Sequence, residues 1–145
     1  MVIAVVDPSG ELLYLWRPDA AQVASVRVVT DKARTAAIYR RPSRDFEEQA
    51  AGGRPSALHL ARAVPLQGGM PILHHGQVVG AIGVSGASSA DEDQELAVLG
   101  AAGVAAGAGR GQASHFLAPA VQARFHEPAD GSATSYRPVE RTRPP

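Results

Sequence analysis

Cysteine is absent from the 145 residues, which excludes disulfides, thiol catalysis, iron–sulfur clusters and cysteine-ligated zinc. Lysine is almost absent, because Lys32 is the only Lys among the fourteen basic residues and the others are Arg. The chain also has no excess charge of either sign, since fourteen basic residues balance fourteen acidic ones. Nothing electrostatic therefore points to DNA, RNA or a membrane surface as a partner.

Long apolar runs and export signals are also lacking. The longest mainly apolar stretch, around residues 96–108, is too short and too rich in Gly and Ala to span a bilayer. The opening residues carry neither the basic region nor the small-residue cleavage site of a secretory signal. We therefore expect a soluble cytoplasmic protein. Its hydrophobic content of 45% is enough for the single core that a chain of this length builds.

The pattern of β-type residues predicts two antiparallel hairpins. In the first, the runs Val2–Val6 and Glu11–Trp16 are separated by an Asp-Pro-Ser-Gly turn, in which Pro fixes φ and Gly supplies a positive φ. In the second, Met70–His74 and Gln77–Ser85 are separated by a tight turn at His75-Gly76. Glycines within the last run predict that another element packs closely against that strand.

Helical patterns lie between and after these hairpins. A buried helical face repeats at steps of three and four, through Val23, Val26, Thr30, Ala33 and Ala37. This helix should end before Pro42, and a short helix is expected over residues 43–50. Ser89-Ala90-Asp91-Glu92 is a capping box that opens a final helix, and Asp93 belongs with it to a cluster of capping carboxylates.

The order of elements predicts an α+β domain with an antiparallel sheet and helices mainly on one of its faces. We place this domain at residues 1–108. Residues 109–145 contain several Pro and Arg and lose the apolar periodicity, so we expect an extended or partly disordered tail in which only residues 116–125 form an amphipathic piece. A sheet with open edges and an uncovered face needs a partner, which predicts self-association.

The adjacent imidazoles of His74 and His75 are the first candidate site. Neighbouring residues of an ideal strand point to opposite faces, so the two rings cannot chelate one metal unless the turn at His75-Gly76 relaxes the strand. A single axial bond from either imidazole to a haem iron stays open as an alternative, because imidazole is a common haem ligand.

Polar residues around a glycine loop form the second candidate site. Bare N–H groups in Gln67-Gly68-Gly69-Met70-Pro71 either hold a carboxylate or phosphate, or belong to a turn that only needs a positive φ. Arg17, Asp19, Lys32 and Arg34 surround the first hairpin's exit and the first helix, where they are either solvated charges or ligand contacts. None of these residues alone identifies a reaction.

Four segments occur together in an order typical of one family: Ala4-Val5-Val6-Asp7-x-x-Gly10-x-Leu12-Leu13, Asp31-Lys32-Ala33-x-Thr35-Ala36, Gly68-Gly69-Met70-Pro71-Ile72, and Gly76-x-Val78-Val79-Gly80-Ala81-Ile82-Gly83-Val84-Ser85-Gly86. With the helix start at Asp91–Ala97, they resemble the GlcG/HbpS family of haem-degrading or haem-binding proteins, also seen as the C-terminal domain of PduO-type corrinoid proteins. The resemblance covers residues 2–107, and its last segment is the most specific.

This resemblance implies an antiparallel sheet of roughly five strands flanked by helices, similar to a profilin or PAS sandwich. It also implies assembly into dimers or higher oligomers such as octamers, and binding of haem or a related tetrapyrrole. Family members usually begin with a helix before the first strand, and this chain begins at that strand. The implied cleft is edged by the glycine loop and the first helix. Its expected ligand-binding residues are Arg17, Asp19, Lys32, Thr35, Gly68, Gly69 and Pro71, with His74 or His75 as axial donor.

Three functions remain open at this stage. The favoured one is a non-catalytic module that binds a tetrapyrrole in an oligomer. The second is a cofactor-independent enzyme of a catabolic or secondary-metabolite pathway, in which Arg17, Lys32 and the amides of Gly68 and Gly69 hold a small anionic metabolite and a His is the acid or base. The third is a structural accessory subunit. The sequence does not decide whether the chain is an enzyme.

Overall fold

The computed structural model describes residues 1–108, and the predictions made above for residues 109–145 lie outside the described part. The elements follow one another as β1 (Val2–Val6), β2 (Leu12–Trp16), α1 (Ser25–Tyr39), α2 (Arg44–Ala51), the short 3-10 helix η1 (Pro55–His59), β3 (Gly69–His74), β4 (Gln77–Ser85) and α3 (Ala90–Ala108). This order confirms the two predicted hairpins, the two helices between them and the final helix. The first helix begins at Ser25, however, so Val23, which was expected on its buried face, precedes it and is exposed.

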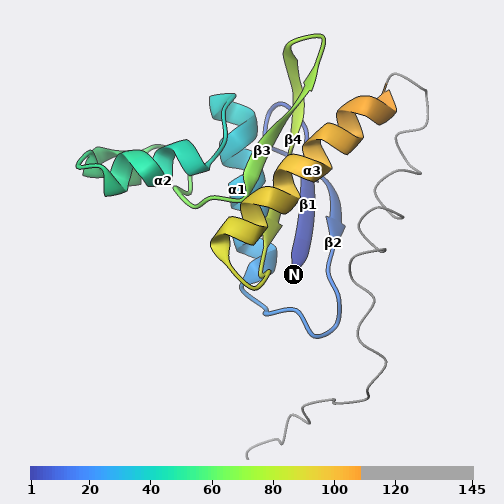
Figure 1. Ribbon diagram of the computed structural model, residues 1–145, viewed down its shortest axis with the longest axis horizontal. Helices are drawn as coiled ribbons and strands as arrows, with labels where there is room; N and C mark the ends of the chain where they lie inside the picture. The colour runs from blue at the N-terminus through green and yellow to red at the C-terminus, as the bar shows by residue number, and fades with distance from the viewer. Residues whose placement is uncertain (109–145) are drawn as a thin grey trace, which may run out of the picture.

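The strands form one antiparallel sheet in the order β2-β1-β4-β3, which confirms the α+β class (Figure 1). The described sheet has four strands, so the expectation of roughly five was too high by one. Each of the four β-type runs of the sequence became a strand. The stretch between Arg40 and Gly68 holds α2, η1 and loops rich in Gly, Pro and charge, and therefore supplies no further strand.

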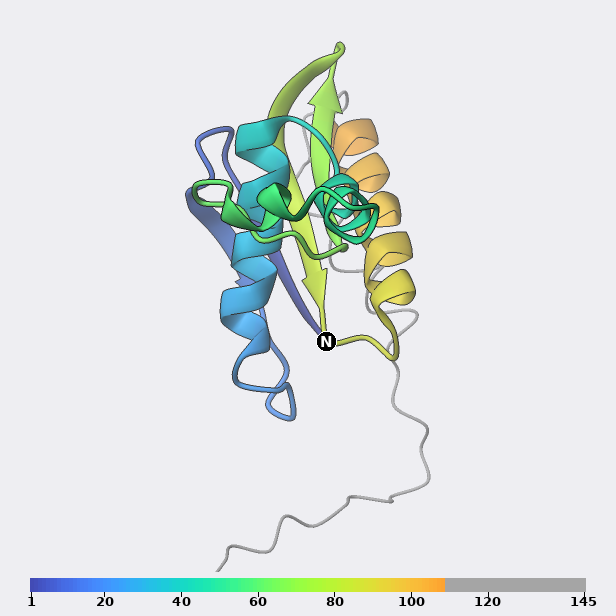
Figure 2. The ribbon, with the colours of Figure 1, turned by 90° about the vertical axis from the view of Figure 1, so that its left-hand side faces the viewer.

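Helices cover both faces of the sheet, which corrects the expectation that they would gather on one (Figure 2). Helix α1 packs on one face, against β1, β3 and β4, and α3 packs against β3 and β4 on the other. The reason lies in the two central strands, which are apolar at successive positions instead of alternating. Val2, Ile3 and Ala4 of β1 are all buried, as are all residues of β4 from Gly80 to Ser85. A strand that is apolar on both sides has to be covered on both sides.

Small residues allow α1 to lie close to the sheet. Ala33, Ala36 and Ala37 of α1 are buried against Val6 and Ala81. Gly83 lies directly beneath this helix, where a Cβ atom would overlap the backbone carbonyl of Val29. The close packing predicted from the glycines of this strand is therefore confirmed. On the other face a larger core forms from Ile3, Ile72, Ile82 and Val84 with Ala97 and Ala101 of α3.

The two hairpins end differently. At the β3–β4 turn, His75 (φ 49°) and Gly76 (φ 75°) both have positive φ, and His74 pairs with Gln77, so the turn is the tight two-residue turn that the sequence predicts. This hairpin extends beyond the rest of the sheet (Figure 1). At the opposite edge of the sheet, β2 pairs with β1 alone and exposes most of its side chains.

Candidate functional site

Lys32, the chain's only lysine, is buried between three elements of the fold. It is 4% exposed, and its Nζ lies 2.8 Å from Oδ2 of Asp93 on α3 and donates a hydrogen bond of 3.1 Å to the carbonyl oxygen of Val84 on β4. Asp93 is 6% exposed and its other carboxylate oxygen accepts from the N–H of Ala87. The ion pair thus joins α1 to β4 and α3 across the edge of the sheet.

This arrangement changes the interpretation of both residues. Asp93 was expected to be one of several capping carboxylates, but it lies in the interior and neutralises Lys32. A buried charge whose donors are directed to oxygen atoms of its own chain holds elements together, and removing either partner strands the other in the interior. Only the tertiary structure could show this pairing, because the two residues are 61 positions apart.

The glycine loop packs against this ion pair. The N–H of Gly68 donates to Oε1 of Gln94 at 2.8 Å, and the N–H of Gly69 donates to Oγ of Ser43 at 2.9 Å. Both glycines are buried, and a Cβ at Gly69 would overlap the carbonyl group of Lys32. Gly68 has a φ of 111°, which only glycine adopts readily. The two amides, for which an anion site and a simple turn were both open, are thus engaged within the chain.

Thr35 is also buried and bonded inside the chain. Its Oγ1 donates to the carbonyl oxygen of Asp31 at 2.7 Å and accepts from the N–H of Val64 at 2.8 Å. This second bond ties α1 to the loop between η1 and β3. Pro71 is half-buried in β3, where it pairs with Ala81 of β4.

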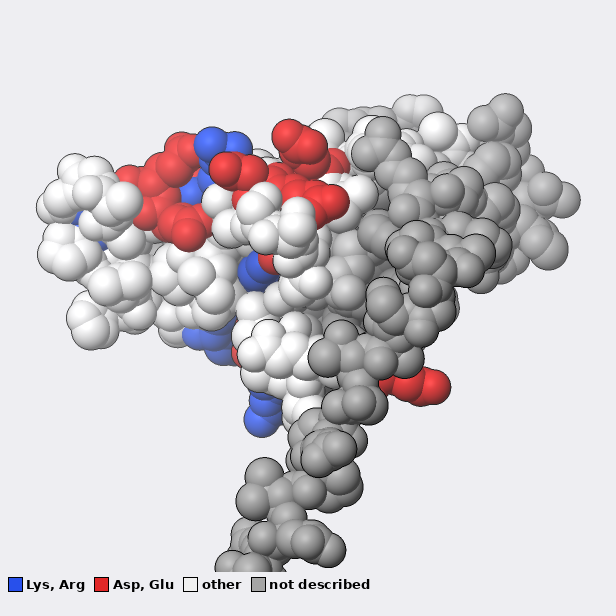
Figure 3. Space-filling view, turned by 60° about the horizontal axis from the view of Figure 1, so that its bottom comes forward, with Lys and Arg blue, Asp and Glu red and all other residues white. Residues whose placement is uncertain are grey.

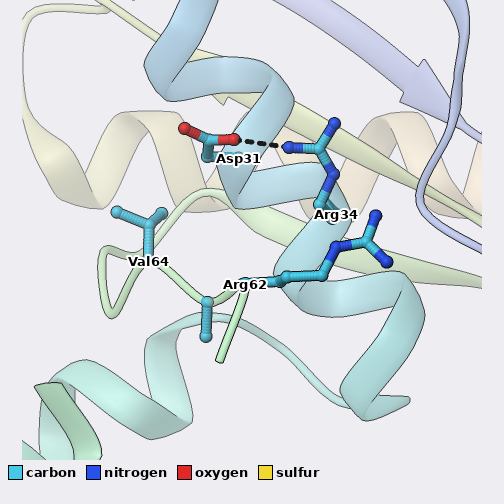
Figure 4. Close-up of a pocket in the computed structure, with 5 residues that line it drawn as sticks. Asp31, Arg34, Arg62 and Val64 are labelled. Carbon is cyan, nitrogen blue, oxygen red and sulfur yellow. Dashed lines mark hydrogen bonds and ion pairs between the residues drawn. The ribbon is translucent and has the colours of Figure 1, made fainter. Parts of the chain in front are cut away.

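A pocket of about 210 Å³ opens beside Thr35, on the side of α1 that faces away from the sheet. It is lined by Asp31 and Arg34 of α1 and by Arg62, Ala63 and Val64 of the loop after η1. The guanidinium groups of Arg34 and Arg62 lie on one side of the pocket and Val64 lies on the other (Figure 4). The pocket therefore combines positive charge with a short apolar wall.

Each guanidinium in this pocket uses only part of its hydrogen-bonding capacity. Arg34 contacts Oδ1 of Asp31 through Nη1 at 2.8 Å and donates from Nε to the carbonyl oxygen of Gly10 at 3.2 Å. Arg62 donates from Nη2 to Oε1 of Glu11 at 3.3 Å, with both side chains more than half exposed. Among residues 1–108, Nη2 of Arg34 and the remaining nitrogens of Arg62 have no hydrogen-bond partner. These nitrogens are available to an anion.

Arg62 enters the pocket through an unusual backbone conformation. Its φ is 55°, in the left-handed region that residues other than Gly, Asn and Asp seldom occupy. Nothing in the sequence around Arg62 signals a site, and sequence reasoning did not single it out. Arg34 was noted only as one of several charges near the first helix.

His74 and His75 lie at the other end of β3 from the glycine loop. Their rings are 4.1 Å apart at an interplanar angle of 65°, because the positive φ of His75 bends the chain out of the extended form. His74 is half-buried, His75 is exposed, and Leu73 and Val79 of the same hairpin are exposed too. The hairpin tip therefore offers two imidazoles beside apolar surface. Five residue steps of β3, about 16 Å, separate His74 from Gly69.

Arg17 and Asp19 lie in the exposed loop between β2 and α1. The guanidinium of Arg17 donates to the carbonyl oxygen of Ala21 at 3.5 Å. In the described part of the chain neither residue makes a hydrogen bond or ion pair with the glycine loop. The structure thus brings Lys32, Gly68 and Gly69 together in the interior, and places Arg17, Asp19 and the two histidines elsewhere.

Acidic side chains gather on one face of the molecule, around a few basic atoms (Figure 3). Arg44 of α2 is paired with an acidic side chain, since its Nε lies 2.7 Å from Oε1 of Glu48. This hydrogen bond and the negative charges of Glu48, Asp91 and Glu47 raise the pKa of the Arg44 guanidinium above its ordinary value. Among residues 1–108, no group of three or more His, Asp or Glu side chains is arranged to hold a metal ion. No helix in this part of the chain has the length and apolar character needed to cross a membrane.

The family model described as haem degrading protein HbpS-like matches residues 1–102. Protein GlcG of Escherichia coli K12 is 40% identical over 83 residues, which are 57% of this chain and 62% of GlcG. The chain thus spans less than two thirds of the length of that relative.

Solved structures show the same fold. A double mutant of Streptomyces reticuli HbpS is 35% identical, with a TM-score of 0.63 over 70% of this chain and 68% of that one. The complex of PduOC with haem has a TM-score of 0.59 over 67% of this chain and 72% of that one. At 24% identity, this second likeness concerns the fold alone.

Proposed function

The chain belongs to the HbpS-like family, and from this premise we propose that it binds haem or a related tetrapyrrole as part of a homo-oligomer in the cytoplasm. The observation that carries the proposal is the match of the haem-related family model to residues 1–102. The 35% identity to HbpS supports it, because it extends over more than two thirds of both chains.

The β3–β4 tip fits the chemistry of an axial haem ligand. His74 and His75 offer imidazole nitrogens at the surface, and the same hairpin exposes the apolar side chains of Leu73 and Val79. The pocket beside α1 does not fit haem, because 210 Å³ is less than the smallest volumes typical of cofactor sites. A haem bound at the tip would therefore be held on an open surface.

A haemin titration of the full-length chain, followed by absorbance, tests this proposal. We expect a saturable Soret band that shifts as the iron takes an imidazole ligand. Replacing His74 and His75 together by Ala should abolish the shift, whereas His59→Ala, a matched change in η1, should preserve it. A featureless titration of folded protein contradicts tetrapyrrole binding. An unchanged spectrum in the double variant rejects these two donors.

A second candidate function rests on the pocket beside α1. Two guanidinium groups with unused N–H donors, next to Ala63 and Val64, suit a small carboxylate or phosphate ester with a short apolar part. This proposal replaces Arg17, Lys32 and the glycine amides by Arg34 and Arg62 as the groups that hold an anion. Thermal-shift measurements with short carboxylates and with inorganic phosphate test it. Binding should be lost in Arg34→Gln and Arg62→Gln but kept in Arg27→Gln, which changes an exposed Arg elsewhere on α1.

A further inference from the structure

Strand β2 is an edge strand that exposes a row of large apolar side chains. Leu12, Leu13, Tyr14 and Leu15 are 47%, 68%, 46% and 37% exposed. β2 packs mainly against β1, so its outer N–H and C=O groups face no strand within the described residues. Natural edge strands are usually protected by charges, proline or a covering element. Leu12–Trp16 contains no charge and no proline, so the strand's own residues do not protect this edge.

We propose that β2 pairs antiparallel with β2 of a second copy of the chain, around a two-fold axis that passes beside Tyr14. In this register the numbers of two residues that lie opposite one another add up to 28. Leu12 then faces Trp16 of the second copy, Leu13 faces Leu15 of the second copy, and the two copies of Tyr14 face each other. The two four-stranded sheets become one continuous sheet.

Charge complementarity selects this register. The first charged residue before β2 is Glu11, whose Oε1 accepts from Arg62 and whose side chain is still 67% exposed, and the first after it is the exposed Arg17. The register centred on Tyr14 places Glu11 of each copy opposite Arg17 of the other, so the two-fold axis generates two ion pairs, one at each end of the apolar row. A shift by one residue places Glu11 opposite Trp16 or Pro18 and removes both pairs.

The same pattern favours a second copy over other occupants of this edge. Opposite charges at equal distances from the centre of a strand are complementary to an antiparallel copy of that strand. A purely apolar peptide or a lipid would gain nothing from them. This interface rests on one part of the proposed function, the homo-oligomer, and names the surface that would form it. It does not depend on haem binding.

The mass of the full-length protein without haemin is the first test. Light scattering coupled to size exclusion should give twice the 15.0 kDa of one chain, or a larger even multiple. Leu13→Glu should halve this mass, because it places a carboxylate opposite Leu15 on each side of the two-fold axis. Val23→Glu is the matched control, since Val23 is 79% exposed and lies outside β2, and its mass should not change. A monomeric wild type, or a Leu13→Glu variant of unchanged mass, overturns the proposal.

Charge exchange tests the register. Glu11→Arg and Arg17→Glu should each weaken the dimer, because each single change places like charges opposite one another at both ends. The double variant Glu11→Arg with Arg17→Glu should restore the wild-type dimer, since the pairs are only reversed. Failure of the double variant to recover contradicts this register.

The absence of cysteine allows a direct test of the two-fold centre. Tyr14→Cys should form a covalent dimer under mild oxidation, because directly opposed residues of an antiparallel pair lie within the range that a disulfide bridges. Val23→Cys is the control and should stay uncrosslinked. If dimers persist but Tyr14→Cys does not crosslink, another surface holds them and the proposal is wrong. If Tyr14→Cys crosslinks and the protein gives no Soret band with haemin, only the proposal of haem binding is contradicted.

Discussion

Helix α1 carries Lys32 on one face and Arg34 on another. The first is a structural charge, and the second is available to a ligand. Lys32 faces the sheet, is 4% exposed and reaches oxygen atoms of both β4 and α3. Arg34, two residues later, keeps 26% of its side chain exposed, borders a pocket and retains an unused nitrogen. Burial with a carboxylate partner fixes elements in place, whereas partial exposure with unused donors leaves the charge free to bind.

The largest expected effect comes from breaking the sheet face of α1. Lys32→Met should lower the free energy of unfolding by about 3–5 kcal/mol, because it strands the Asp93 carboxylate in the interior. Urea unfolding followed by circular dichroism measures this loss. Adding Asp93→Asn to Lys32→Met should recover part of it, since the amide oxygen still accepts from Ala87 and no charge remains buried. A double variant that is less stable than Lys32→Met would contradict the conclusion that Asp93 neutralises Lys32.

The next effect concerns the close contact between α1 and β4. Gly83→Ala should lower the free energy of unfolding by about 1–3 kcal/mol, because the new methyl group would meet the Val29 carbonyl and force α1 away from the sheet. The matched change is Gly103→Ala on α3, where a Cβ meets no atom within 4 Å. That variant should be more stable by about 0.5–1 kcal/mol, since Ala is the better helix former. Equal effects of the two changes on the free energy of unfolding would contradict the close packing of α1 on Gly83.

On the pocket face of α1 the effect on stability should be small and the effect on binding large. Arg34→Gln loses the partly exposed pair with Asp31, which contributes about 1 kcal/mol or less to the free energy of unfolding. Its affinity for a small anion should nevertheless fall by at least about tenfold, because a charge-assisted hydrogen bond is lost. Calorimetric titration with the anion found in the thermal-shift screen measures this change. If Arg34→Gln is strongly destabilised and still binds the anion, Arg34 is a structural charge and not a ligand contact.

The smallest effect is expected at Arg44, an exposed charge away from both faces. Its pKa is raised in the folded state, chiefly by the hydrogen bond to Glu48, so any stabilisation is present at every pH below the ordinary pKa of arginine and is lost only as the pH rises through the raised pKa. Arg44→Gln should therefore leave the urea midpoint unchanged throughout the neutral range. If the urea midpoints of Arg44→Gln and the wild type differ between acid and neutral pH, the pair with Glu48 is less exposed than the structure shows.

Local chemistry made the strands and helices predictable. The turn at His75-Gly76 follows from glycine's tolerance of positive φ, and α1 follows from small residues at helical spacing. The predicted capping of α3 by Ser89 is present, because its Oγ accepts from the N–H of Glu92 at 3.1 Å. These features depend on residues close together in the chain, so the sequence displays them directly.

The candidate sites were less predictable, because they depend on which distant residues meet. Gly68 and Gly69 were recognised as special, but only the fold shows that their amides bond to Gln94 and Ser43. Arg62 reaches the pocket from a loop without a motif, through a backbone conformation that no local signal announces. The partner of Lys32, which lies 61 positions away, cannot be predicted from its neighbours along the chain.

By itself the sequence determined the elements, their order, the family resemblance and the exclusion of all cysteine chemistry, since each of these follows from residue type and local spacing. The tertiary structure decided that helices cover both faces of a four-stranded sheet, that Asp93 neutralises Lys32, and that β2 is left with its apolar side chains exposed. The physical reason is burial. Whether a charge is paired or a leucine is covered depends on what the rest of the chain places against it.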